Sequence, residues 1–194
     1  MSIFISIASY QDPLLVSTIF SAYNNARNKD ELVFSICDQS DDGIKVEEIG
    51  FVDQIHYEHV NPLFSKGPCW ARHRAQNFFN DEDFFLQIDS HTQFAPNWDV
   101  IFIDQLNKIA STTSDDGYFE KPIITAYPRS FEVVDFDKGV FALNMGDKFT
   151  QVIMYRKDGL FSSGSFSRQI GMPTKYADIT HAILMAAGCI FTRG

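Results

Sequence analysis

Short apolar segments that alternate with segments of helical periodicity most strongly constrain the fold of this 194-residue chain. Residues 3–9 and 32–37 are rich in β-branched and aromatic residues and have the length of buried strands. Between them, Asp12 and Pro13 are typical of a helix start, with Asp12 as N-cap and Pro13 at the first helical position. A strand–helix–strand unit of this kind predicts parallel strands joined by a right-handed crossover.

The same alternation continues along the chain to about residue 127. Further strands are expected at 54–60, 84–88 and 122–127, and further helices at Gly67-Pro68 and Asn97-Trp98. After residue 130 we expect an antiparallel strand at 151–155, its turn at 157–159 and a loop at 162–176. The expected fold class is α/β: a Rossmann-like, mostly parallel sheet flanked by helices, with an antiparallel C-terminal portion.

The composition argues against several classes of protein. The net charge of −9 disfavours a nucleic-acid partner, because nucleic-acid binding needs a basic face. No apolar run reaches the length of a transmembrane helix, and no basic segment precedes the apolar N-terminus, so we expect neither a membrane partner nor a secretory signal. The three cysteines are widely spaced and form no zinc-type pair, which favours reduced thiols in a cytoplasmic compartment.

Polar residues gather where the expected strands end. Ser9 and Tyr10 end the first strand, and Asp38 follows the second. Asp89 and His91 follow the apolar strand near the middle of the chain. Because ligands of open parallel sheets bind beyond the carboxyl ends of the strands, these residues are candidates for one binding site.

Asp89 and His91 are candidate metal ligands. Residues two apart in a strand point the same way, so the carboxylate and the imidazole could converge on one ion past the strand end. A carboxylate oxygen and an imidazole nitrogen suit Mn²⁺, Mg²⁺ or Zn²⁺. A strand followed by an ordinary polar turn would give the same sequence, so both interpretations stay open here.

Arg72 is a candidate phosphate ligand, because it lies in the first turn of the helix that follows Gly67-Pro68. A helix N-terminus offers free N–H groups, and arginine offers paired donors. A solvated basic patch on an acidic protein is the alternative. The sequence has no glycine-rich phosphate loop, so neither ATP hydrolysis nor hydride transfer is expected.

Four motifs occur in an order that is specific when they are taken together: Ile5-Ser6-Ile7-Ala8-Ser9-Tyr10 with Asp12-Pro13, Ile36-Cys37-Asp38-Gln39, Gly67-Pro68 with Ala71-Arg72, and Phe85-Leu86-Gln87-Ile88-Asp89-Ser90-His91. With this set, the chain resembles the N-terminal part of the GlcNAc-transferase family, in particular its UDP-GlcNAc-dependent, hydroxyproline-polypeptide type. Trp98-Asp99 and the segment Ala186-Ala187-Gly188-Cys189-Ile190-Phe191 add to the resemblance.

The resemblance implies a GT-A glycosyltransferase domain, with a nucleotide-sugar-binding half at 1–128 and the start of an acceptor half at 129–194. It implies transfer of GlcNAc from UDP-GlcNAc to a hydroxyl of a polypeptide or glycan acceptor, with Mn²⁺ or Mg²⁺ as cofactor. Matched residue by residue, the family's donor-binding positions are Ser9, Tyr10, Asp38, Arg72 and Gly188, and its metal ligands are Asp89 and His91.

The resemblance also predicts a C-terminally incomplete chain, because the family continues into a segment that supplies acceptor contacts and the catalytic carboxylate. No catalytic residue is therefore assigned. A non-catalytic nucleotide-sugar-binding module that needs a partner is the alternative function. A metal-dependent hydrolase built on Asp89 and His91 ranks last, since the chain lacks the further ligand cluster that such an enzyme needs.

Overall fold

A computed structural model of the chain describes residues 1–111, 121–126, 128, 130–136, 138–143, 151–155, 169–173 and 185–194. The chain divides into two compact units, one formed by Met1–Ile124 with Ile190–Gly194 and the other by Thr125–Cys189. In the part of the chain that the structure describes, no helix is long and apolar enough to cross a membrane.

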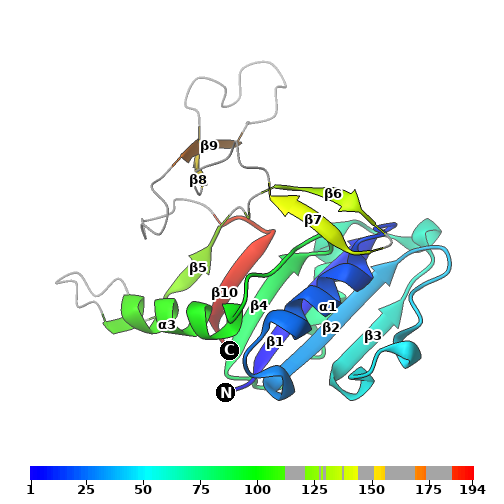
Figure 1. Cartoon of the computed structure of the whole chain (residues 1–194), viewed down its shortest axis with the longest axis horizontal. Helices are drawn as coiled ribbons and strands as arrows, with labels where there is room; N and C mark the ends of the chain where they lie inside the picture. Colours follow the sequence, from blue (N-terminus) through cyan, green and yellow to red (C-terminus); the bar gives the residue numbers. More distant parts are fainter. Residues whose placement is uncertain are drawn as a thin grey trace. The chain divides into compact units, whose positions relative to one another are not determined.

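A six-stranded sheet forms the centre of the first unit, in the order β3-β2-β1-β4-β10-β5 (Figure 1). Both β2 and β4 pair with β1 in parallel, and β3 pairs with β2 in parallel. These pairings confirm the expected Rossmann-like, mostly parallel sheet. The strands are β1 (Ile3–Tyr10), β2 (Leu32–Gln39), β3 (Ile55–His59), β4 (Phe84–Asp89), β5 (Ile123–Thr125) and β10 (Cys189–Arg193).

Helices cover both faces of this sheet. Phe34 and Ser35 are neighbours in β2 and therefore point to opposite faces. On one face, Phe34 packs against Phe51, which also contacts Phe20 of α1. On the other, the Ser35 hydroxyl donates a 2.7 Å hydrogen bond to the Ala75 carbonyl of α2. The helices are α1 (Leu15–Asn25), α2 (Pro68–Gln76) and α3 (Trp98–Ser111), with short 3₁₀ turns η1 (Lys29–Glu31), η2 (Val46–Glu48), η3 (Val52–Gln54) and η4 (Pro62–Phe64).

The start of α3 is tied to α1 and to the loop that follows it. The Trp98 indole N–H donates a 2.8 Å hydrogen bond to the Ala22 carbonyl. The buried Asp99 carboxylate accepts 2.9 Å hydrogen bonds from the backbone N–H groups of Arg27 and Asn28. Asp99 therefore has a structural role in the first turn of α3.

Phenylalanines form much of the core between the sheet and its helices. Phe4 and Phe34 are fully buried, and Phe84 of β4 stacks on the buried Phe191 of β10 with 5.4 Å between ring centroids. Burying a side chain of this size stabilises the fold by roughly 1.5–3 kcal/mol. This packing holds β10 in the sheet and keeps the strand ends in fixed register.

The second unit contains two antiparallel strand pairs. They are β6 (Phe131–Asp135) with β7 (Val140–Leu143), and β8 (Gln151–Tyr155) with β9 (Gln169–Pro173). The antiparallel C-terminal portion and the strand at 151–155 are therefore confirmed. The expected loop at 162–176 is wrong where β9 forms, because pairing with β8 supplies backbone hydrogen bonds that local composition does not reveal. The expected turn at 157–159 lies outside the described residues.

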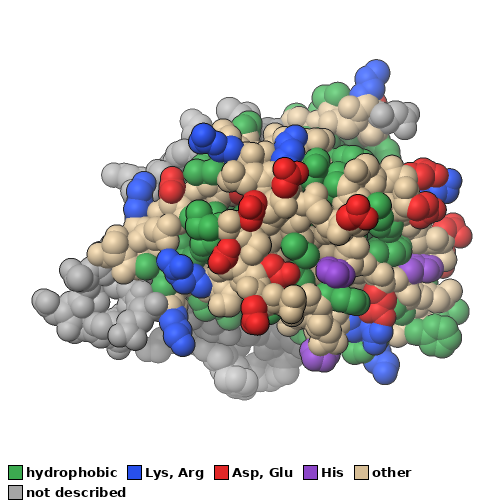
Figure 2. Space-filling model, turned by 90° about the horizontal axis from the view of Figure 1, so that it is seen from below, with side chains coloured by type: hydrophobic (Ala, Val, Ile, Leu, Met, Phe, Trp, Pro, Cys, Tyr) green, Lys and Arg blue, Asp and Glu red, His purple; other side chains and the backbone are tan. Residues whose placement is uncertain are grey.

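Seen from below the view of Figure 1, acidic side chains are interspersed with basic ones and form no large patch of one sign (Figure 2). A protein with a net charge of −9 needs local cations wherever it binds an anionic ligand.

Candidate functional site

The strand order reverses at β1, since β2 and β3 extend the sheet on one side of it and β4 lies on the other. In open parallel sheets, ligands bind in the crevice outside the carboxyl ends of the strands at such a reversal. Register places Ser9 beside Asp38 on one side, and Ala8 beside Asp89 on the other. The structure therefore brings the predicted residues of β1, β2 and β4 to one edge of the sheet.

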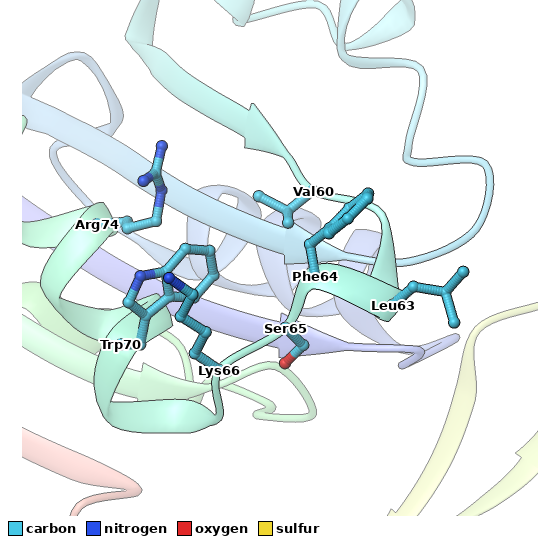
Figure 3. A pocket seen from close by; sticks show the side chains of 7 residues that line it. All are labelled: Val60, Leu63, Phe64, Ser65, Lys66, Trp70 and Arg74. Atoms are coloured by element: carbon cyan, nitrogen blue, oxygen red, sulfur yellow. The ribbon is translucent and has the colours of Figure 1, made fainter.

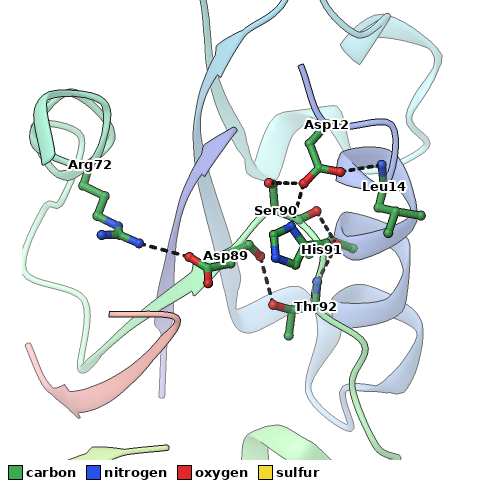
Figure 4. A network of polar contacts seen from close by, with 8 residues as sticks. Asp12, Leu14, Arg72, Asp89, Ser90, His91 and Thr92 are labelled. Atoms are coloured by element: carbon green, nitrogen blue, oxygen red, sulfur yellow. Dashed lines mark hydrogen bonds and ion pairs between the residues drawn. The ribbon is translucent and has the colours of Figure 1, made fainter. Parts of the chain in front are cut away.

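Asp89 lies at the end of β4 and forms an ion pair with Arg72 of α2 (Figure 4). The distance from Arg72 Nη2 to Asp89 Oδ1 is 3.0 Å. The arginine side chain is 18% exposed and the carboxylate 42%. Arg72 Nε is buried and has no hydrogen-bond partner among the described residues. The Arg72 guanidinium thus neutralises part of the charge of the Asp89 carboxylate.

Helix α2 presents an open N-terminus next to this pair. Gly67 precedes it with φ of 90°, a conformation that favours glycine, and Pro68 occupies the first turn. A Cβ added at Gly67 would meet no atom within 4 Å, so space remains above the helix end. Arg72 is the fifth residue of this helix, so it lies in the second turn and not in the first turn that sequence reasoning expected. The N–H groups at the helix start and the Arg72 cation are both electropositive.

His91 has a different partner from Asp89. Strand β4 ends at Asp89, so the two-residue periodicity of a strand does not extend to His91. Its Nδ1 lies 2.7 Å from Asp12 Oδ2, while the Asp89 carboxylate is bonded to Arg72 (Figure 4). The Ser90 hydroxyl donates to the same Asp12 oxygen at 2.6 Å. Asp12 thus holds both residues that follow the strand.

These contacts correct the expected role of Asp12. Helix α1 begins at Leu15, and Leu14 occupies the N-cap position. Asp12 Oδ1 accepts a 2.9 Å hydrogen bond from the Leu14 N–H, while its other oxygen binds the residues after β4. Burial by itself would raise the pKa of Asp12, but hydrogen bonds from Ser90, His91 and the Leu14 N–H outweigh burial and lower it. Asp12 is therefore a fixed anion at neutral pH.

Ser9 and Asp38 lie side by side at the ends of β1 and β2. Both are buried, with 1% exposure each. Asp38 Oδ2 accepts 2.9 Å hydrogen bonds from the hydroxyls of Ser40 and Tyr57. Ser9 Oγ has no hydrogen-bond partner among the described residues. An unpaired buried hydroxyl is costly unless a ligand completes it, so Ser9 is a candidate contact.

Tyr10 and Gly188 complete the set of predicted donor residues. Tyr10 ends β1 and its side chain is 58% exposed, which leaves the ring accessible to a ligand. Gly188 is buried in the turn before β10, within the second compact unit. Its place in the donor site remains a prediction.

A separate open hollow of about 530 Å³ lies between η4 and α2 (Figure 3). It is lined by the largely exposed Leu63 and Phe64, and by Trp70, whose ring contacts the cations of Lys66 and Arg74. None of the predicted donor or metal residues lines it. The candidate site at the carboxyl ends of the strands is therefore distinct from this hollow.

A comparison with protein-family models matches residues 40–194 to the family described as glycosyltransferase (GlcNAc). The chain belongs to this family. The matched range contains Arg72, Asp89, His91 and Gly188, whereas Ser9, Tyr10 and Asp38 precede it. Searches of the curated proteins and of the solved structures found no match.

A glycosyltransferase of this family uses a nucleotide-sugar donor. At the carboxyl end of β4, the side chains of Asp89 and His91 are candidate ligands of a divalent cation. Asp89 Oδ2 and His91 Nε2 have no hydrogen-bond partner among the described residues. A carboxylate oxygen and an imidazole nitrogen are suitable ligands. Within the described ranges, no group of three or more His, Cys, Asp or Glu side chains could hold a metal. Asp89 and His91 could therefore supply two ligands to a cation, whose other ligands would come from water or phosphate.

Asp12 and Ser90 belong to the candidate site, although sequence reasoning gave neither of them a role in it. Asp12 resembles a helix N-cap in sequence, and Ser90 resembles a turn residue. Their meeting depends on β1 and β4 being adjacent and in register. The sequence does show a carboxylate near the end of each strand, Asp12 for β1 and Asp89 for β4. It does not show that the two strands are neighbours, because local sequence does not encode strand order.

Proposed function

We propose that the chain is a GT-A-type glycosyltransferase that transfers GlcNAc from UDP-GlcNAc to a hydroxyl acceptor on a polypeptide or glycan, with Mn²⁺ or Mg²⁺. The match of residues 40–194 to the GlcNAc glycosyltransferase family carries this proposal. The polar groups at the strand-order reversal support it, because they offer separate contacts for a nucleoside, a diphosphate and a cation.

In this proposal Ser9, Tyr10 and Asp38 bind the uridine. Ser9 Oγ is a buried hydroxyl without a partner among the described residues, so a hydrogen bond to the nucleoside would satisfy it. Among the described residues, the hydroxyls of Ser40 and Tyr57 both donate to Asp38 Oδ2, which leaves Oδ1 for a ligand N–H or hydroxyl. The exposed Tyr10 ring offers an apolar face.

Arg72 and the N-terminus of α2 bind the diphosphate. Arginine forms strong paired hydrogen bonds with phosphate, and the Arg72 side chain is partly exposed. Asp89 and His91 would hold the cation, through the carboxylate and Nε2. A bound divalent cation supplies Lewis-acid stabilisation of the departing UDP.

These positive groups explain how an acidic protein can bind an anionic ligand. The two negative phosphates would bind Arg72 and a helix N-terminus, which are locally positive although the net charge of the chain is −9.

Calorimetric titration with UDP in the presence of Mn²⁺ tests the proposal. Wild-type protein is expected to bind, and Asp89→Ala is expected to lose the Mn²⁺-dependent part of the affinity. Asp104→Ala, which removes an exposed carboxylate on α3, is the control and should bind as wild type. Absence of binding in the wild type, or unchanged binding in Asp89→Ala, would refute the assignment.

A further inference from the structure

We propose that Asp12 is a positioning residue that holds His91 in one tautomer, with the proton on Nδ1 and the lone pair of Nε2 directed to a divalent cation. This inference rests on the proposed function, since it names the residue that prepares one of the two candidate metal ligands. It assigns a function to a contact between the loop after β1 and the turn after β4.

The geometry of the pair determines which nitrogen carries the proton. Nδ1 of His91 lies 2.7 Å from Asp12 Oδ2. An ionised carboxylate only accepts hydrogen bonds, so this contact requires N–H at Nδ1. In the neutral imidazole the other nitrogen, Nε2, is then the acceptor. The histidine side chain is 59% exposed, so Nε2 is accessible to a ligand, whereas Asp12 is only 14% exposed.

Asp12 is itself held in place by three hydrogen-bond donors. Ser90 Oγ and His91 Nδ1 bind its Oδ2, and the Leu14 N–H binds Oδ1. A carboxylate bound in this way has little rotational freedom, so the imidazole that it accepts from is also fixed in orientation. The Ser90 side chain is buried, which protects this part of the network from water.

The segment from Asp89 to Thr92, which contains both candidate ligands, is anchored to α1 as well. Thr18 Oγ1 donates a 2.7 Å hydrogen bond to the Ser90 carbonyl and accepts a 3.0 Å hydrogen bond from the Thr92 N–H. Thr92 Oγ1 donates to the Asp89 carbonyl at 2.9 Å. The backbone from Asp89 to Thr92 is therefore positioned from both sides, which is the arrangement that a preformed ligand pair needs.

A carboxylate that accepts a hydrogen bond from a metal-binding histidine fixes the tautomer of the imidazole and increases the basicity of the ligating nitrogen. Loss of such a partner typically weakens metal binding by roughly 10–100-fold. Asp12→Asn keeps an oxygen for the Leu14 N–H but removes the charge, so we expect it to weaken Mn²⁺ binding by about 10-fold or more. Ser90→Ala removes one donor to Asp12 and is expected to have a smaller effect in the same direction.

Nitrogen-15 NMR of the wild-type protein tests the tautomer without any variant. The assigned His91 imidazole, measured in its neutral form without metal, is expected to carry its proton on Nδ1. A proton on Nε2 would overturn the inference whatever the behaviour of the metal. In Asp12→Asn, a mixture of the two tautomers is expected.

Titration of free Mn²⁺ by electron paramagnetic resonance gives the second readout, with Asp104→Asn as a control of equal charge change. Affinity that falls in Asp89→Ala and in Asp12→Asn, but not in Asp104→Asn, supports the inference. Affinity that falls in Asp89→Ala but not in folded Asp12→Asn would overturn it and leave the proposed function standing. Wild-type affinity that does not depend on Asp89 would remove the metal assignment of the proposed function, and with it this inference.

Discussion

Arg72 Nη2 lies 3.0 Å from Asp89 Oδ1, so the candidate phosphate ligand and a candidate metal ligand neutralise each other in the free protein. Both residues have a second role in the proposed complex, in which Arg72 binds the diphosphate and Asp89 binds the cation. The ion pair thus keeps a carboxylate and a guanidinium, oriented by α2 and β4, at the site before the donor arrives.

Arg72→Gln is expected to change the affinities for metal and nucleotide in opposite directions. Without its partner Asp89 should bind Mn²⁺ more tightly, by about 1.5- to 5-fold, since an ion pair of this exposure contributes roughly 0.2–1 kcal/mol. UDP binding should weaken by roughly 1.5–3 kcal/mol through loss of charge-assisted hydrogen bonds. Calorimetry with each ligand measures both effects.

Arg74→Gln is the matched control for that experiment, because Arg74 lies on the same helix and pairs with Glu58 instead. It should leave both affinities near the wild-type values. Weaker Mn²⁺ binding in Arg72→Gln would contradict competition between the arginine and the metal for Asp89.

Ser9→Ala is expected to stabilise the fold while weakening the binding of UDP. Ser9 Oγ is buried without a partner among the described residues, and such a hydroxyl costs about 1–3 kcal/mol. Removing it should raise the free energy of unfolding by up to about 1 kcal/mol, since the cavity left behind offsets part of the gain. The same hydroxyl is a proposed uridine contact, so affinity should fall by about 1 kcal/mol.

Ser6→Ala separates the two effects, because Ser6 is also buried and unpartnered among the described residues but lies deeper in β1. Urea unfolding should show stabilisation in both variants, and calorimetry should show weaker UDP binding in Ser9→Ala alone. Equal UDP affinities for the two variants would argue against Ser9 as a donor contact.

Asp99 is expected to make the stability of the fold depend on pH. Burial alone would raise its pKa, but hydrogen bonds from the backbone of Arg27 and Asn28 outweigh burial and lower it below the ordinary value of 3.8. The carboxylate therefore contributes stability that is complete above this value and is lost as the pH falls through the lower pKa of the folded state.

Asp99→Asn should lower the free energy of unfolding by about 1–3 kcal/mol at neutral pH and flatten its decline below about pH 4. Urea unfolding at several pH values measures both effects. Asp104→Asn, on the exposed side of α3, should leave the pH dependence unchanged. A decline in Asp99→Asn as steep as that of the wild type would assign the acid sensitivity to other carboxylates, among them Asp12, whose pKa is also lowered.

The parallel sheet could be predicted from sequence because its strands carry their own signal. Strands β1, β2 and β4 consist of apolar runs of the right length, and polar residues mark their carboxyl ends. The strand β9 could not be predicted, since the segment before it is rich in Ser and Gly and its hydrogen bonds come from β8.

For the site, sequence identified which residues end the strands but not which of them meet. The pairing of Asp12 with His91 joins residues far apart in sequence, and it depends on β1 and β4 being neighbours. The pairing of Arg72 with Asp89 depends equally on where α2 packs. Local patterns indicate residue chemistry, whereas packing decides the partner.

Release of UDP from UDP-GlcNAc, measured with the purified chain in the presence of Mn²⁺, tests the proposed glycosyltransferase activity most directly. Release is expected to stop when the metal is chelated and in Asp89→Ala, and to persist in Asp104→Ala. Tight, Mn²⁺-dependent UDP binding without any release, with or without a hydroxyl acceptor, would contradict glycosyl transfer and identify a binding module instead.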